Sequence, residues 1–341
     1  MKSSLEHLAA SYASIAIIGM CKNAGKTEVL NYLIKRYSNA DDILGLTSIG
    51  RDGEALDQAT FTKKPKIFVN QGTLIATAKK SLFLCDFTKE ILYTTGIKTP
   101  MGEVVIVRAL SAGYADIAGA SMVQELVKVK ELLYSFGASR LLIDGALSRK
   151  SLSSPILTDG IILSTGAALS KSVTRVISET VHTVRLFSLE PIEDERLKSL
   201  AEKNGENNVV VIINRDYSTA TLKVISSLHC SKELIDSLAE DSSYVLINGA
   251  VTDKLLIDLL AKRQLLNKLT LIVQDPTKLL ISEDALAKFL HTGASIKVLK
   301  KSPLLAVTIN PTSPSGYDFN GEEFKEALQK RIPIPVINVY N

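Results

Sequence analysis

Short apolar runs rich in valine and isoleucine alternate with helical patterns along almost the whole chain, and this alternation most constrains the fold. Each run followed by a helical pattern predicts a strand and a crossover helix, the unit from which parallel sheets are built. The runs are continuously apolar, so we expect the strands to be buried on both faces. The sequence therefore predicts an α/β fold with a mostly parallel sheet.

A chain of 341 residues is long for one hydrophobic core and comfortable for two. The segment 188–208 interrupts the alternation with a proline and dense charge, which predicts a boundary near residue 190. We expect a first domain over 1–190 and a second α/β domain over 191–341 that is available for partner binding. The expected strands are 14–19, 43–49, 66–69, 103–109, 140–146, 159–164, 209–214, 244–249, 269–274, 295–299 and 304–309, with a proline-containing edge strand at the end. The expected helices are 26–38, 72–81, 118–136, 168–180, 231–240, 252–264, 282–291 and 321–330.

Composition excludes several classes of function. The net charge of +4, from 40 basic and 36 acidic residues, is too even to predict a nucleic-acid partner. The three cysteines are far apart and lack C-x-x-C spacing, which argues against a disulfide framework and a structural zinc site. No stretch approaches the roughly 18 unbroken apolar residues of a membrane span, and the apolar run before residue 20 is typical of a buried strand rather than a signal peptide. We expect a cytoplasmic protein that binds neither nucleic acid nor membrane.

The segment GMCKNAGKT, residues 19–27, lies between an expected strand and an expected helix. The phosphate-loop pattern G-x-x-x-x-G-K-[ST] requires glycine at position 20, where the chain has Met20, with Gly19 one residue early. A loop in this place directs backbone N–H groups and the positive end of the helix dipole into a volume that suits phosphate. We predict a phosphate-binding loop with a different turn out of its strand and with Met20 in an ordinary backbone conformation.

The residue types of this loop predict their roles toward ATP and magnesium. Lys26 would reach the β- and γ-phosphates, Thr27 would offer its hydroxyl to Mg²⁺, and Gly25 would let the backbone approach the phosphate. The guanine-reading N-K-x-D pattern is absent, since the Asn-Arg-Asp at 214–216 is one residue short, and this favours ATP over GTP. A loop that contains these residues by chance is the competing interpretation. The expected nucleotide-binding residues are Gly19, Lys22, Asn23, Ala24, Gly25, Lys26 and Thr27.

Acidic residues follow two other expected strands. Asp144 ends an apolar run and is the best candidate for the acid that holds Mg²⁺ directly or through water, although it could simply cap the following turn. Asp52 and Glu54, with Arg51 beside them, follow the expected strand 43–49 and could orient water or Mg²⁺, or form a solvated turn. No histidine has the neighbours of a catalytic relay. The expected catalytic residues are Lys26, Asp52 and Asp144, and the expected magnesium ligands are Thr27 and Asp144, with Asp52 or Glu54 acting through water.

Stretches spread over much of the chain carry a resemblance to known proteins. The segment KNAGKT resembles the loops of SIMIBI-class P-loop proteins, such as MobB-like and dethiobiotin-synthetase-like proteins. The segments IAIIGMCKNAGKT, LGLTSIGRDGE, GTLIATA, TTGIKTPMGEVVIVRAL, INPTSPSGYDF and IPVINV resemble the KamB-like reactivase subunits of lysine 5,6-aminomutase. This resemblance implies a nucleotide-dependent chaperone that acts with a MutS-like ATPase subunit on a cobalamin-dependent aminomutase and helps it to release damaged cofactor.

Three functions follow as alternatives. The first is a P-loop ATPase that acts as a reactivating chaperone and that could form a homodimer. The second is a small-molecule ligase or kinase of the dethiobiotin-synthetase-like class, in which the second half of the chain binds a small acid. The third is a binding module whose loop has lost its activity, for which the shifted Gly19 is the direct support.

Overall fold

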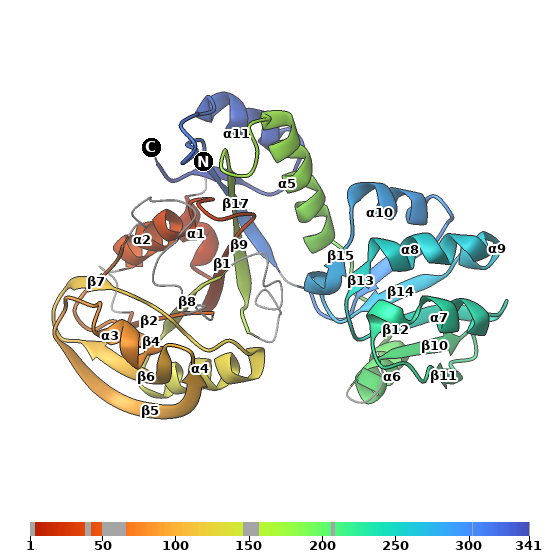
Figure 1. The fold of residues 1–341 in the computed structure, drawn as a ribbon, viewed down its shortest axis with the longest axis horizontal. Helices are drawn as coiled ribbons and strands as arrows, with labels where there is room; N and C mark the ends of the chain where they lie inside the picture. The colour runs from red at the N-terminus through yellow and green to blue at the C-terminus, as the bar shows by residue number, and fades with distance from the viewer. Residues whose placement is uncertain are drawn as a thin grey trace. The chain divides into compact units, whose positions relative to one another are not determined.

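The computed structural model describes residues 4–37, 42–49, 66–145, 157–205, 209–301 and 303–340. The chain forms two compact units (Figure 1). The first unit combines Met1–Val181 with Pro303–Asn341, and His182–Ser302 forms a second unit, here called the inserted unit. The expected division into 1–190 and 191–341 is therefore wrong in its second half, because the chain returns to the first unit at Pro303.

The first unit is built around one mixed sheet. Its strands are β1 (Ser14–Gly19), β2 (Leu44–Ser48), β4 (Leu74–Ala78), β5 (Lys89–Thr99), β6 (Gly102–Ala109), β8 (Arg140–Asp144), β9 (Gly160–Gly166), β17 (Leu304–Asn310) and β18 (Val336–Asn338). They lie in the order β18-β17-β9-β1-β8-β2-β4-β6-β5. Neighbours from β18 to β4 run parallel, and β6 is antiparallel to β4 and to β5. The strands β3 (Ile67–Val69) and β7 (Gly113–Ala115) form a separate antiparallel pair.

Helices cover both faces of this sheet. They are α1 (Leu5–Ala9), α2 (Lys26–Tyr37), α3 (Lys79–Leu82), α4 (Val123–Ser135), α11 (Gly321–Gln329) and α5 (Val173–Phe187), which continues into the inserted unit. In β8, Leu142 packs with residues of α1 and α2, whereas Leu141 and Ile143 pack with residues of α4. The pair α1 and α2 therefore covers one face and α4 the other (Figure 1). This two-sided burial explains why most of the strands are apolar throughout.

The inserted unit is a smaller α/β structure. Its strands β10 (Val210–Asn214), β11 (Thr219–Thr221), β12 (Ser242–Ile247), β14 (Thr270–Val273) and β16 (Ser295–Val298) form a sheet in the order β11-β10-β12-β14-β16. Helices α7 (Ser231–Ser237), α8 (Asp253–Leu259) and α10 (Glu283–Leu290) pack on one face, and α6 (Glu195–Gly205) packs on the other. The remaining short elements are η2 (Ser227–His229), β13 (Val251–Thr252), η3 (Leu260–Lys262), α9 (Arg263–Leu266), η4 (Pro276–Lys278) and β15 (Leu279–Leu280).

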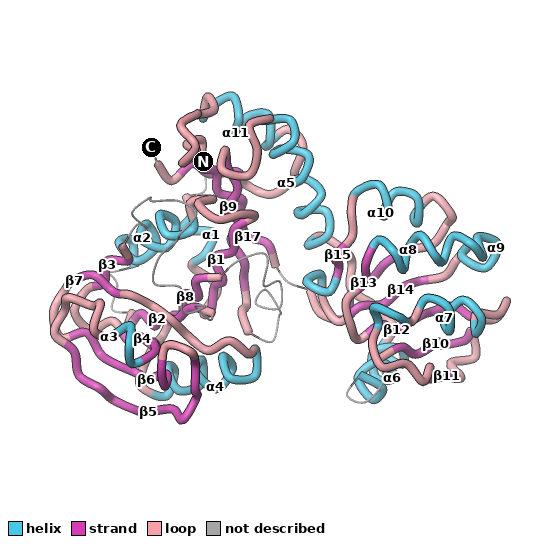
Figure 2. The backbone as a smooth tube through the Cα atoms, viewed as in Figure 1, coloured by secondary structure: helices cyan, strands magenta, loops and turns pink. Residues whose placement is uncertain are grey.

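The α/β prediction is confirmed, and Figure 2 shows helices and strands in both units. Each expected strand is present, and its ends agree with the prediction to about two residues. The expected helix 72–81 is wrong, because this segment contains β4 and only then the short α3. Leu74 and Ala76 face the α4 side and Ile75 the opposite side, so burial on both faces overrides the helical propensity of the alanines. The strand β5 has no counterpart among the expected strands. No helix in the described ranges is long and apolar enough to cross a membrane.

Candidate functional site

The 19–27 loop leaves the sheet at the carboxyl end of β1, between β8 and β9. The backbone N–H of Met20 donates to the carbonyl of Ser164 (2.9 Å), which extends the β1–β9 pairing one residue past the strand. The hydroxyl of Thr180 on α5 donates to Sδ of Met20 (3.2 Å). Met20 is absent from the described residues with positive φ, so its expected ordinary backbone conformation is confirmed.

Gly19 leaves space for the side chain of Lys26. A Cβ on Gly19 would lie 2.8 Å from Cγ of Lys26 and 3.1 Å from its Nζ. Such contacts are closer than carbon atoms tolerate, so Lys26 folds back across the end of β1 only because residue 19 has no side chain. The glycine that is one position early in the motif therefore leaves room for the lysine.

Two loop residues adopt left-handed backbone conformations. Gly25 has a φ of +95°, which favours glycine, and Asn23 has a φ of 59°, which asparagine tolerates better than most residues. Helix α2 begins at Lys26, and the N–H of Val29 donates to the carbonyl of Gly25 (3.1 Å). The N–H groups of the first helical turn lack partners within the helix, as at every helix start. These two residues therefore shape the turn that connects β1 to α2.

Asp144 lies at the same edge of the sheet as the 19–27 loop. It is the last residue of β8, where it is paired in register with Ile17 of the adjacent β1. The N–H of Gly145 donates to the carbonyl of Ile17 (2.9 Å), so the two chains stay paired up to this point. The structure therefore brings Asp144 next to the strand that carries the loop.

The other expected acidic residues lie outside the described ranges. Arg51, Asp52 and Glu54 belong to this undescribed part of the chain. The hydroxyl-bearing Thr27 is half-buried in the first turn of α2. In the described ranges, no group of three or more His, Cys, Asp and Glu side chains is placed to hold a metal ion. Thr27 carries a hydroxyl and Asp144 a carboxylate, and a role of these oxygens as magnesium ligands stays a prediction.

Asn310, at the end of β17, joins three loops at this edge and was missed by the sequence analysis. Its side-chain Nδ2 donates to the carbonyl of Asn23 (3.1 Å), and its Oδ1 accepts from the N–H of Thr312 (3.1 Å). Its carbonyl accepts from the N–H of Ala167 (2.9 Å), and it is 9% exposed. The signal was present as an asparagine that ends an apolar run before a proline. The expected boundary placed it in the other domain.

Tyr340, just past β18, is the second residue that the sequence analysis missed. Its Oη would lie 2.6 Å from a Cβ on Gly25, and Asn310 Cβ would lie 3.2 Å from the same position. The absence of a side chain at Gly25 therefore leaves room for both neighbours. The segments that follow β17 and β18 thus both contact the 19–27 loop.

The segment SPSGYDF, residues 313–319, lies at the same sheet edge as the loop. The hydroxyl of Tyr317 donates to the carbonyl of Ala167 (2.6 Å), in the turn after β9. The ring of Phe319 packs edge-on against Phe324 of α11, with 5.4 Å between centroids.

Cys21 lies within the loop, next to the candidate phosphate site. Burial raises the pKa of its thiol, Glu179 raises it further, and Lys26 opposes them in part. A raised pKa keeps the thiol protonated at neutral pH and lowers its reactivity. This environment favours Cys21 as a small residue that fits the loop over Cys21 as a reactive thiol.

The Asn-Arg-Asp segment, residues 214–216, belongs to the inserted unit and lies at the end of β10.

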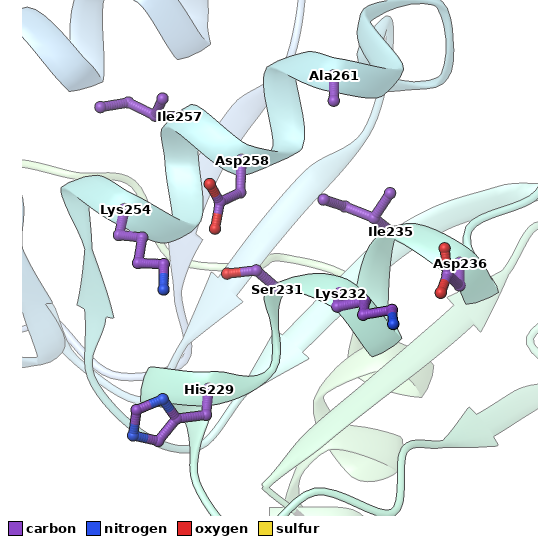
Figure 3. Close-up of a pocket in the computed structure, with 9 residues that line it drawn as sticks. All are labelled: His229, Ser231, Lys232, Ile235, Asp236, Lys254, Ile257, Asp258 and Ala261. Atoms are coloured by element: carbon purple, nitrogen blue, oxygen red, sulfur yellow. The ribbon is translucent and has the colours of Figure 1, made fainter.

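The inserted unit contains an open pocket of about 540 Å³ between α7 and α8 (Figure 3). Lysines and aspartates both line the pocket, so its charge is mixed. The lining residues are His229, Ser231, Lys232, Ile235, Asp236, Lys254, Ile257, Asp258 and Ala261.

Comparisons with known proteins add no family to this description. No protein-family model matches the chain, and no curated protein and no solved structure matches it. The fold and the geometry described above therefore carry the functional argument.

Proposed function

We propose that the chain is a P-loop ATPase whose phosphate site is the 19–27 loop. One observation carries the proposal: Lys26 follows a positive-φ glycine at the start of α2 and folds back across Gly19 at the end of a buried parallel strand. This arrangement supports an anion site with a cation beside it.

The residues present fit ATP and magnesium in this role. The N–H groups at the start of α2 would bind the phosphates, and Lys26 would stabilise negative charge on the β- and γ-phosphates. Thr27 and Asp144 would hold Mg²⁺, which neutralises phosphate charge when bound. Gly19, Lys22, Asn23, Ala24 and Gly25 would complete the loop around the phosphates. Asp52 and Glu54 stay candidates for orienting water.

The biological role that we propose is reactivation of a partner enzyme. The resemblance to KamB-like reactivase subunits supports a cytoplasmic chaperone that works with a MutS-like ATPase subunit. Its client would be an adenosylcobalamin-dependent lysine 5,6-aminomutase, and nucleotide binding would be coupled to release of damaged cofactor. Such a machine needs phosphate and magnesium binding and a conformational response to them, and it needs no covalent nucleophile.

The magnesium-dependent step tests the enzymatic part of this proposal. Asp144→Asn is expected to lower Mg²⁺-dependent ATP hydrolysis by at least about tenfold, because a neutral amide is a weaker ligand for a divalent ion. Binding of ATP in the presence of EDTA should change little. Asp284→Asn is the matched control, since Asp284 pairs with Lys288 on the surface of α10 in the inserted unit. Equal hydrolysis by both variants would remove Asp144 from the site.

The partner role needs a separate assay. Inactivated aminomutase, the MutS-like subunit and this chain are mixed with ATP, and recovered mutase activity is measured. Lys26→Ala should abolish the recovery that the wild-type chain supports. Recovery that does not depend on this chain would contradict the reactivase role and leave the ATPase proposal standing.

A ligase or kinase of the dethiobiotin-synthetase-like class is the second candidate. The pocket between α7 and α8 favours it, because Lys232, Lys254 and His229 line it and could bind a small acid, although two aspartates line the same pocket. This alternative requires a small acid that stimulates release of ADP when no protein partner is present. A screen of small carboxylic acids for stimulated ADP release distinguishes it from the chaperone.

A further inference from the structure

Tyr340 places a phenol hydroxyl beside the 19–27 loop. Its Oη would lie 2.6 Å from a Cβ on Gly25, and its Cζ would lie 3.5 Å from the same position. The residue is 43% exposed, so part of it is open to solvent. The hydroxyl therefore lies against the side of Gly25 that has no side chain, in the turn that leads into α2.

This hydroxyl has no acceptor in the part of the chain that the structure describes, where Tyr340 bonds only through its backbone N–H, to Oδ1 of Asn338 (3.1 Å). Two other tyrosines differ. Tyr317 donates to the carbonyl of Ala167 (2.6 Å), and Tyr32 donates to a carboxylate oxygen of Glu6 (2.8 Å). Burial raises the pKa of Tyr340, with a smaller contribution from Glu28, so its phenol stays protonated at neutral pH. Tyr340 thus offers an O–H donor that is bonded to no described protein group.

The position of Tyr340 is fixed by the sheet. The strand β18 pairs in parallel with β17, and Asn338, which accepts from Tyr340, is in register with Ile309. The next residue of β17 is Asn310, whose side chain donates to the loop carbonyl of Asn23. The same pair of strands therefore holds the loop and the phenol, and a donor held in place in this way loses little freedom when it binds.

We propose that Tyr340 is a phosphate-contacting residue whose hydroxyl donates to an oxygen of the polyphosphate bound by the 19–27 loop. This inference rests on the proposed function, because it needs a phosphate in the loop. A ring that merely covers the loop and competes with nucleotide is the opposing interpretation. The two predict changes of opposite sign in affinity when the side chain is removed.

Calorimetric titration of the full chain with ATP and with inorganic tripolyphosphate, both with Mg²⁺, separates these interpretations. Tyr340→Phe removes only the hydroxyl, so both ligands should bind about tenfold more weakly, as expected for a lost hydrogen bond to a charged group. Tyr93→Phe is the control, because Tyr93 lies on the edge strand β5 and is 46% exposed.

Three results would overturn the assignment. Unchanged binding by Tyr340→Phe would mean that the hydroxyl contacts no ligand. A loss for ATP without a loss for tripolyphosphate would place the contact on the nucleoside. Tighter binding by Tyr340→Ala would make Tyr340 a cover that competes with the ligand.

A fluorescence reporter gives a local readout, because the sequence contains no tryptophan. Tyr340→Trp places a single indole beside the loop, and its emission should change on addition of tripolyphosphate and saturate with the calorimetric affinity of the same variant. Tyr93→Trp should show no change. If the fluorescence of Tyr340→Trp does not change at saturating tripolyphosphate, this result counts against a contact between residue 340 and the ligand.

Failure of this inference can be told apart from failure of the proposed function. If the wild-type chain binds ATP and Lys26→Ala does not, while Tyr340→Phe behaves like the wild type, only the assignment of Tyr340 is wrong. If the wild-type chain binds neither ligand, the phosphate site is wrong and the role of Tyr340 is wrong with it.

Discussion

At the scale of single residues, the two glycines of the 19–27 loop serve different steric purposes. Gly19 leaves space for the side chain of Lys26, whereas Gly25 both adopts a φ of +95° and leaves space for Tyr340 and Asn310. The motif pattern alone treats the shift of the first glycine as a defect. In the structure, the side chain of Lys26 packs across Gly19, at the end of β1.

Substitution of Gly19 tests this interpretation. In Gly19→Ala, the added Cβ must displace the flexible Lys26 side chain, so nucleotide affinity should fall by about tenfold or more while the free energy of unfolding changes by less than about 1 kcal/mol. Calorimetry and urea denaturation measure the two effects. In a Lys26→Ala background the same substitution should have no further effect on affinity. An equal additional loss in that background would mean that Gly19 acts independently of Lys26.

Gly25 should respond in stability as well as in binding. Gly25→Ala forces alanine into a left-handed conformation, which costs roughly 1–3 kcal/mol of unfolding free energy, and its Cβ also meets the Tyr340 hydroxyl. Urea denaturation of Gly25→Ala with and without Tyr340→Ala separates these contributions. In the double variant, the clash between the added Cβ and Tyr340 should disappear, whereas the cost of the left-handed alanine should persist. If the free energy of unfolding of the double variant equals that of Tyr340→Ala alone, backbone strain at residue 25 contributes nothing.

At the scale of elements, the pattern of apolar runs predicted the strands well because most of them are buried on both faces. The strand β5 escaped prediction for the opposite reason. It forms an edge of the sheet, and its residues Glu90, Ile91 and Tyr93 are exposed, so it lacks the continuous apolar signal. The pairing of β17 with β9 was also invisible, because a segment of sequence cannot reveal which distant strand it joins.

Asn310, at the end of β17, should contribute both to the stability of the fold and to nucleotide binding by the 19–27 loop. Asn310→Ala removes the bonds to Asn23 and to Thr312, so the free energy of unfolding should fall by about 1–2 kcal/mol and nucleotide affinity should fall too. Asn320→Ala is the control. It removes the N-cap of α11 at a similar cost of about 1 kcal/mol and should leave affinity unchanged. Equal effects of both variants on affinity would assign the Asn310 result to general destabilisation.

At the scale of the whole molecule, the first unit is interrupted by the inserted unit. The 19–27 loop and Asp144 could be predicted because each is marked locally by a strand and its following residues. Asn310 and Tyr340 could not, since their place beside the loop depends on the return of the chain: the bond from Asn310 to Asn23 spans 287 positions. A sequential reading of two domains separates these partners.

Fragments of the chain test the interrupted organisation. The fragment 182–302 should fold by itself, because it contains a complete sheet with helices on both faces. The fragment 1–190 should be unstable, because it lacks β17 and β18 and leaves β9 as a bare edge. Circular dichroism and cooperative urea unfolding of each fragment measure this. If the fragment 1–190 is stable and unfolds cooperatively, the division into domains 1–190 and 191–341 is supported instead.

Calorimetric titration of the wild-type chain and of Lys26→Ala with MgATP tests the central claim most directly. We predict saturable binding by the wild type, a loss of at least about tenfold in Lys26→Ala, and no loss in Lys35→Ala, whose lysine is exposed farther along α2. Thermal unfolding without ligand should agree among the three proteins. Absence of binding by the wild type, or equal affinity of Lys26→Ala, would contradict a phosphate site in the 19–27 loop.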